Sequence, residues 1–179
     1  MTKVLIVLYS RTGTARQVAL QLQQISGWPI GEVRDVRPRV GFIGDLRCVL
    51  DSLLARSAPY TFEGPPIDGF DRLVVLTPIW VDGLASPMRA LMRALMRDVV
   101  RAGRPVSLIC VMSRGGAFRA ADEITTILGE APDPVLGLKQ ADVLSGSCLS
   151  ALSSLVDTVN ALDAEPVITR PMWLSTHAA

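Results

Sequence analysis

Short apolar runs that alternate with helical patterns constrain the fold of this chain more than any other feature. The runs at residues 3–9, 73–76 and 106–111 are continuous, rich in β-branched residues and too short for helices, as in strands buried on both faces. A more polar strand is expected at 30–36, near a sheet edge, and a fifth strand within 135–144. Between the strands, the spacing of apolar residues predicts helices at 14–24, 42–56, 86–101, 118–128 and 147–162.

Five strands that alternate with helices predict an α/β fold in which helices cover both faces of a parallel sheet. Ser86 and Pro87 are expected to be the N-cap and first residue of their helix. Residues 57–71 are expected to form a Pro/Gly-rich loop. We predict one domain over 1–162 and a C-terminal tail over 163–179, in which the apolar Pro-Met-Trp-Leu segment could dock on the domain.

Composition narrows the classes of function. The net charge is +1, which is low for a chain that binds nucleic acid or an anionic membrane, and no stretch is long and apolar enough for a membrane span. Hydrophobic residues make up 49% of the chain, which leaves room for a homo-oligomer contact. Three separated cysteines and a single histidine, His177, do not supply a zinc site or a Ser-His-Asp triad. Unpaired thiols suit the cytoplasm.

The segment after the first strand has the composition of an anion site. It consists of Ser10, Arg11, Thr12, Gly13, Thr14 and Ala15, and it joins a buried strand directly to a helix. Backbone amides and the dipole at a helix N-terminus attract phosphate, and a glycine allows a tight turn close to the ligand. The spacing is neither that of a Walker A loop nor that of the dinucleotide-binding G-x-G-x-x-G motif. The alternative is that the hydroxyl groups only cap the helix.

These residues carry a resemblance to a known family. The sequence S-R-T-G-T at 10–14, after KVLIVLY, resembles the phosphate loop of flavodoxin-like FMN proteins. The sequences D-x-x-V-V-L-T-P-I-W at 71–80 and GLASPMRALM at 83–92 resemble the third strand of that family, its first flavin loop and the helix after it. The sequence SRGGA at 113–117 resembles the second, glycine-rich flavin loop. The resemblance implies a doubly wound, five-stranded sheet of order 2-1-3-4-5, with FMN at the switch between the first and third strands. One departure is Ala15, which stands where the family's pattern has a hydroxyl residue.

The two flavin loops supply the remaining candidate residues. Trp80 is the candidate wall for the isoalloxazine ring, because aromatic stacking stabilises a flat ligand; the alternative is a core or interface residue. The resemblance places Met112, Ser113 and Arg114 beside the pyrimidine end of the ring, where Arg114 would stabilise the anionic reduced flavin. The cofactor-binding residues expected in these loops are Pro78, Ile79, Trp80, Val81 and Gly83, then Ser113, Arg114, Gly115 and Gly116.

Four arginines recur at a spacing of four on the helix at 86–101, namely Arg89, Arg93, Arg97 and Arg101. They predict a single charged ridge, either a solvated face or a docking surface for an acidic protein partner. Two classes of function remain. One is an FMN-dependent oxidoreductase or electron carrier, reduced by NAD(P)H or by a redox partner, in which the flavin does the chemistry and no side chain is catalytic. The other is an interaction or regulatory module of the same fold with weak or no flavin binding.

Overall fold

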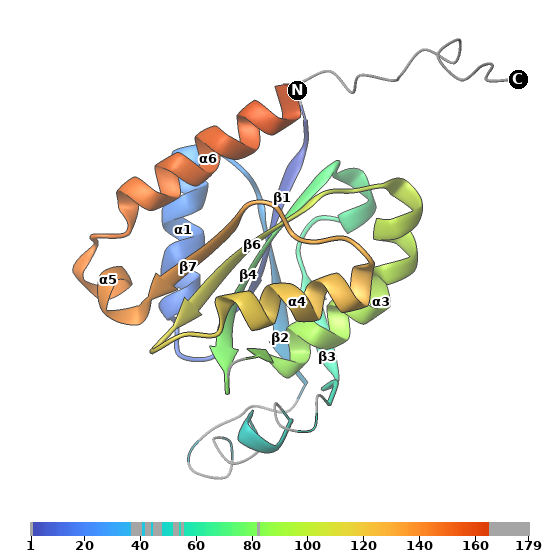
Figure 1. Cartoon of the computed structure of the whole chain (residues 1–179), viewed down its shortest axis with the longest axis vertical. Coiled ribbons are helices and arrows are strands. Elements are labelled where there is room, and N and C mark those ends of the chain that lie inside the picture. Colours follow the sequence, from blue (N-terminus) through green and yellow to red (C-terminus); the bar gives the residue numbers. More distant parts are fainter. Residues whose placement is uncertain are drawn as a thin grey trace, which may run out of the picture.

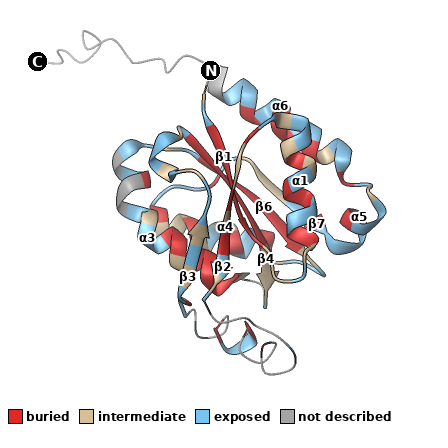
Figure 2. Cartoon of the chain, turned by 180° about the vertical axis from the view of Figure 1, so that it is seen from behind, coloured by how far each residue is buried: buried red, intermediate tan, exposed pale blue. Residues whose placement is uncertain are grey.

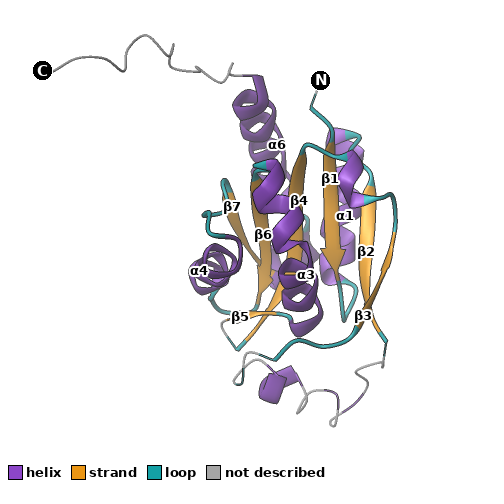
Figure 3. Cartoon of the chain, turned by 90° about the vertical axis from the view of Figure 1, so that its right-hand side faces the viewer, coloured by secondary structure: helices purple, strands orange, loops and turns teal. Residues whose placement is uncertain are grey.

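The computed structural model of the chain describes residues 2–36, 41, 44, 48–51, 54, 56–81 and 83–164. Its centre is a mostly parallel β-sheet with helices on both faces (Figures 1 and 3), which confirms the predicted α/β fold. The strands follow one another across the sheet in the order β3-β2-β1-β4-β6-β7. They are β1 (Val4–Tyr9), β2 (Ile30–Asp35), β3 (Tyr60–Glu63), β4 (Arg72–Trp80), β6 (Val106–Met112) and β7 (Val135–Lys139), and β5 (Gly83–Leu84) pairs with β4.

Helices on both faces make the central strands fully buried, which explains their continuous apolar sequences. On one face, the side chains of Ile6 and Leu8 pack against the helices α1 (Thr14–Ser26), α5 (Gln140–Ser145) and α6 (Leu149–Ala164). On the other face, Leu5 and Val7 pack against α3 (Ser86–Ala102) and α4 (Ala117–Leu128). Figure 2 shows the buried residues gathered on the sheet and on the inner sides of the helices.

The number of strands was predicted wrongly. Within the described residues the sheet has seven strands rather than five, and its full order differs from 2-1-3-4-5 because β3 lies outside β2. Residues 57–71, expected to be a loop, contain β3 and the short 3-10 helix η1 (Ile67–Gly69). β3 pairs antiparallel with β2, so that Val33 lies opposite Phe62. The parallel strands β2, β1, β4, β6 and β7 are neighbours in that order.

The limits of two elements also differ from expectation. β4 is longer than the run expected at 73–76 and continues through Pro78 to Trp80, where it pairs antiparallel with β5. The N-cap of α3 is Ala85, and Ser86 is the first helical residue. The Ser86 hydroxyl donates a hydrogen bond to Asp51 Oδ2 at 3.3 Å, so it is not a helix cap.

Two predicted segments lie largely outside the described residues. In the predicted helix at 42–56, residues 44 and 48–51 are helical, and most of the remainder is not described. Residues 165–179 of the predicted tail are not described either, so the boundary between domain and tail stays a prediction. Among the helices that the structure describes, none combines the length and the apolar character needed to cross a bilayer.

Candidate functional site

The carboxyl ends of the parallel strands bring the three predicted loops together. β1 leads into loop 10–15, the end of β4 and β5 form segment 77–83, and β6 leads into loop 113–116. The parallel registers place Leu8 of β1 opposite Leu76 of β4, and Thr77 of β4 opposite Cys110 of β6. The three loops therefore start at the same end of the sheet, where the carboxyl ends of these strands lie. In open α/β sheets, ligands usually bind at this carboxyl end of the strands.

A cavity of about 140 Å³ lies between these loops. Its lining includes residues from all three, together with one residue that follows β7. The lining residues are Ser10, Arg11, Thr12, Thr14, Ala15, Pro78, Ile79, Trp80, Val111, Met112, Ser113 and Gln140. The volume is below the roughly 300 Å³ at which pockets begin to enclose a whole small molecule. The cavity therefore has room for a small anionic group, and a larger ligand would extend along the open loops around it.

The Ser10 side chain organises the loop that borders this cavity. Its Oγ accepts hydrogen bonds from the backbone N–H groups of Gly13 and Arg16, both at 3.2 Å. Gly13 has a φ of 93°, a left-handed conformation that glycine adopts without strain, and it immediately precedes α1. With two acceptor positions of the hydroxyl in use, the remaining hydrogen-bonding capacity of Ser10 is its O–H donor. Ser10 thus caps the turn and can still donate to an anion.

Several donors at the start of α1 have no acceptor within the described part of the chain. They are the backbone N–H groups of Thr12, Thr14 and Ala15 and the hydroxyl of Thr14. Thr14 and Ala15 are buried, and all three residues line the cavity. Buried donors without an acceptor are costly, and the helix dipole adds partial positive charge at this position. The arrangement fits a phosphate group, and Ala15 contributes to it through its amide rather than through a side chain.

The aromatic wall expected from the sequence lies beside this anion site. Trp80 is half-buried at the end of β4, and it lines the cavity together with Pro78 and Ile79. Its ring packs at 80° against the ring of Tyr9, with the centroids 5.5 Å apart. The structure therefore brings a flat apolar surface to the loop that carries the unpaired donors.

Six of the predicted site residues do not line the cavity. Val81 is half-exposed, and Ser113 is the only residue of loop 113–116 in the lining. Gly83 lies instead against the polar side chains of Glu123 and Arg89, where an added Cβ would be 3.3 Å from Glu123 Oε2. The residues outside the lining are Gly13, Val81, Gly83, Arg114, Gly115 and Gly116.

Sequence reasoning missed Gln140 and Val111 in the lining. Gln140 directly follows β7, and it begins α5. Like the residues of the other loops, Gln140 is a polar residue immediately after a strand. The sequence placed the fifth strand only within 135–144, so the residue that follows this strand was not identified.

Cys110 lies on β6, two residues before the cavity-lining Met112. It is fully buried, and burial raises the pKa of its thiol to about 12. A protonated thiol is a poor nucleophile, so Cys110 acts as a small apolar core residue.

A larger cavity, of about 540 Å³, lies at the opposite end of the strands. Two arginines in its lining already bind oxygen atoms of the protein. Arg72 Nη1 donates to the Asp133 carbonyl oxygen at 3.0 Å, and Arg104 Nη2 donates to the Asp68 carbonyl oxygen at 3.0 Å. The unpaired donors described above are at the smaller cavity, which is therefore the candidate site.

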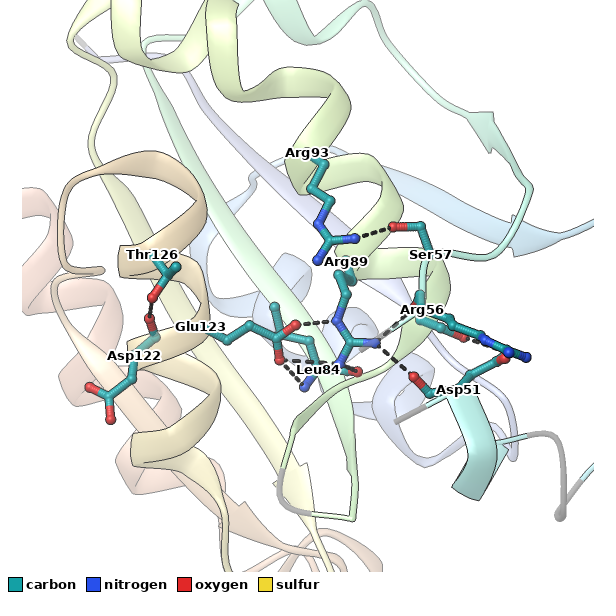
Figure 4. Close-up of polar contacts among 10 residues, drawn as sticks. Asp51, Arg56, Ser57, Leu84, Arg89, Arg93, Asp122, Glu123 and Thr126 are labelled. Atoms are coloured by element: carbon teal, nitrogen blue, oxygen red, sulfur yellow. Dashed lines mark hydrogen bonds and ion pairs between the residues drawn. The ribbon is translucent and has the colours of Figure 1, made fainter. Parts of the chain in front are cut away.

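The predicted arginine ridge is not continuous, because Arg89 is buried rather than exposed. Figure 4 shows its side chain pointing toward Glu123 and Asp51. Its guanidinium forms an ion pair with Glu123 of α4. Arg93, one turn later, is exposed and donates a hydrogen bond to Ser57 Oγ at 2.9 Å. The side chains of Arg97 and Arg101 lie outside the described residues. The prediction that Arg89 contributes to a docking surface is therefore wrong.

Comparison with protein-family models and with curated proteins finds no match for this sequence. Solved structures do match. A putative flavoprotein from Bacteroides uniformis has a TM-score of 0.66 at 13% identity, over 87% of this chain and 98% of that chain. A flavoprotein from Lactobacillus acidophilus in complex with FMN has a TM-score of 0.58 at 14% identity, over 82% and 99%. A Fusobacterium nucleatum flavodoxin bound to flavin mononucleotide has a TM-score of 0.55 at 9% identity, over 90% and 99%.

Proposed function

We propose that this chain, whose fold is that of flavodoxin-like flavoproteins, binds FMN and acts in electron transfer or as an FMN-dependent oxidoreductase. The observation that carries the proposal is the set of unpaired donors around the cavity at loop 10–15. Neutral amides and hydroxyls at a helix N-terminus suit a phosphate, and the half-buried Trp80 beside them suits a flat ring. The matched structures that contain FMN support the same ligand.

Each part of the site has a role in this proposal. The amides of Thr12, Thr14 and Ala15 and the hydroxyls of Ser10, Thr12 and Thr14 would hold the phosphate. Trp80 would orient the ring, with loop 113–116 at its other edge. Bound FMN would supply the redox chemistry, taking electrons from NAD(P)H or a partner protein and passing them to an acceptor. The protein would position the cofactor and adjust its potential through hydrogen bonds and nearby charge.

We also propose a cytoplasmic location. Cys48, Cys110 and Cys148 are buried and form no disulfide. Buried thiols of this kind are compatible with a reducing compartment. Exposed Arg93 supports a contact with an acidic redox partner on that part of α3, without the contribution of Arg89.

The test is a visible spectrum of the purified protein, followed by titration of the apo form with FMN and with riboflavin. We expect saturable FMN binding. Thr12→Ala and Thr14→Ala should each weaken FMN binding by about tenfold, because hydrogen bonds to charged groups are worth about 1.5–3 kcal/mol. Neither should weaken riboflavin binding, since riboflavin has no phosphate.

The matched control is Thr126→Ala, which removes an exposed threonine hydroxyl that donates a hydrogen bond to the Asp122 carbonyl oxygen at 2.9 Å, away from the cavity lining. It should bind FMN as the unmodified protein does. A colourless protein that does not bind added FMN would refute the proposal and leave the interaction or regulatory module as the better explanation of the fold.

A further inference from the structure

The ion pair between Arg89 and Glu123 joins segments that are far apart in the sequence (Figure 4). Arg89 lies in the first turn of α3, and Glu123 lies in the middle of α4. The side chain of Arg89 is 2% exposed and that of Glu123 is 21% exposed, so the pair is largely shielded from water. A buried pair of charges does not by itself stabilise a fold, so its other contacts are informative.

Every N–H group of the Arg89 guanidinium is matched by an acceptor. Nε and Nη2 donate to the two carboxylate oxygens of Glu123, and Nη2 also donates to the Leu84 carbonyl oxygen at 3.0 Å. Nη1 donates to the carbonyl oxygens of Asp51 at 3.2 Å and Arg56 at 2.9 Å. A lysine has three donors on one atom and could not reproduce this planar arrangement.

Both backbone polar groups of Leu84 belong to this cluster. Its carbonyl oxygen accepts from Arg89, and its N–H donates to Glu123 Oε2 at 3.0 Å. Leu84 ends β5, the strand that pairs antiparallel with the end of β4, where Ile79 lies opposite Leu84 and Trp80 opposite Gly83. Gly83 has no side chain that would press on the Glu123 carboxylate. The ion pair thus fixes the strand that holds Ile79 and Trp80 in place.

We propose that Arg89 and Glu123 are positioning residues that hold the Trp80 wall of the site at the correct place for a flavin ring. Glu123 belongs to α4, the helix that directly follows loop 113–116, so the pair also ties the two ring-binding loops to each other. This inference rests on the proposed function. It goes beyond the proposed function because it states that two side chains outside the cavity lining, Arg89 and Glu123, determine how well the flavin ring binds.

The experiment uses Glu123→Gln, which keeps the size of the side chain but removes its charge and one of its two acceptor oxygens. The first measurement is riboflavin binding. We expect about tenfold weaker binding of both riboflavin and FMN, by the same factor, because the ring wall is affected and the phosphate site is not. Thr12→Ala should show the opposite pattern, a loss for FMN alone. A role limited to global stability would also weaken both ligands equally, and the second measurement distinguishes that role from local positioning.

The second measurement is amide hydrogen exchange at Leu84 in the apo protein, which does not depend on flavin. We expect exchange to be at least about tenfold faster in Glu123→Gln, with unchanged exchange in the central strand β1. The matched controls are Asp122→Asn, at the neighbouring exposed carboxylate of α4, and Arg93→Met, one turn after Arg89 on α3. Neither should change riboflavin binding or Leu84 exchange.

A second variant covers the case in which Glu123→Gln does not fold because the charge of Arg89 is left unpaired. Arg89→Met combined with Glu123→Leu removes both charges, which proteins with buried ion pairs often tolerate. It should fold and show the same weaker riboflavin binding and faster Leu84 exchange. A folded variant with both quantities unchanged would overturn this inference alone. An unmodified protein that binds neither flavin would overturn the proposed function and this inference with it.

Discussion

The rings of Tyr9 and Trp80 meet nearly at right angles, at 80°, with 5.5 Å between their centroids. Tyr9 is the last residue of β1 and is buried, and its hydroxyl donates to Asp35 Oδ2 of β2 at 2.6 Å. Trp80 is the last residue of β4, the strand beside β1. The sheet therefore sets the orientation of the Trp80 ring, which suits a rigid wall for a flat ligand.

Removing that wall should weaken flavin binding. Trp80→Ala is expected to lower FMN affinity about two- to tenfold, because aromatic pairs are worth about 0.5–1.5 kcal/mol beyond the area they bury. Trp80→Phe keeps an aromatic face and should retain most of the affinity. Fluorescence titration of the apo protein measures both. Equal affinities for the unmodified protein and Trp80→Ala would show that the ring does not bind at Trp80.

Val81 stores backbone strain next to the wall. Its φ is +47°, a left-handed conformation that β-branched residues rarely adopt, and its side chain is half-exposed. Val81→Asn should raise the free energy of unfolding by about 1 kcal/mol, because asparagine tolerates this conformation. Val100→Asn, at a similarly exposed valine within α3, should bring no gain. Urea denaturation measures both, and equal effects would argue against strain at Val81.

The β2–β3 pairing depends on the absence of a side chain at Gly31. A Cβ at this position would overlap the ring of Phe62 on β3. Gly31→Ala should therefore lower the free energy of unfolding by about 1–3 kcal/mol through overpacking. Gly69→Ala is the control, since a Cβ at Gly69 would have no neighbour within 4 Å. Thermal denaturation gives the midpoint temperature of each variant, and we expect a lower midpoint for Gly31→Ala. Similar midpoints for the two variants would contradict the packing at Gly31.

Cys110 should make stability depend on alkaline pH. Burial raises the pKa of its thiol from 9.0 to about 12, so the folded protein keeps the proton that the unfolded chain loses above pH 9. The stabilising contribution is complete below pH 9 and is lost as the pH rises towards 12, at about 1.4 kcal/mol per pH unit.

Cys110→Ala isolates this effect. The variant should be less stable near pH 7, because it leaves a small space in the core, but its stability should fall less steeply between pH 9 and 11. Urea denaturation at each pH gives the two slopes. Parallel slopes for the unmodified protein and the variant would mean that Cys110 does not titrate on unfolding.

The strands that sequence reasoning found and missed differ in burial. The continuous apolar runs of β1, β4 and β6 were recognised because these strands are covered on both faces. β3 has only four residues, alternates between half-buried and exposed, and lies at the sheet edge beside β2. Its short Tyr-Thr-Phe-Glu pattern acquires a strand conformation through hydrogen bonds with β2, a partner distant in the sequence.

Arg89 shows the limit of periodicity as a guide to exposure. Its spacing of four from Arg93 correctly placed both residues on one side of α3. The spacing does not determine which part of that side of the helix is covered by neighbouring helices and strands. At Arg89 the side of the helix is covered by α4, β5 and the segment around Asp51, whereas at Arg93 it is exposed.

The sequence by itself determined the α/β architecture, the places of the strand-to-helix turns and the polar character of loop 10–15. These properties follow from local patterns of apolar, hydroxyl and glycine residues. Only the tertiary structure decided which donors of that loop are left without an acceptor, which residues meet at the cavity and that the Arg89 charge is paired with Glu123. These features depend on contacts between segments far apart in the chain, which no local pattern encodes.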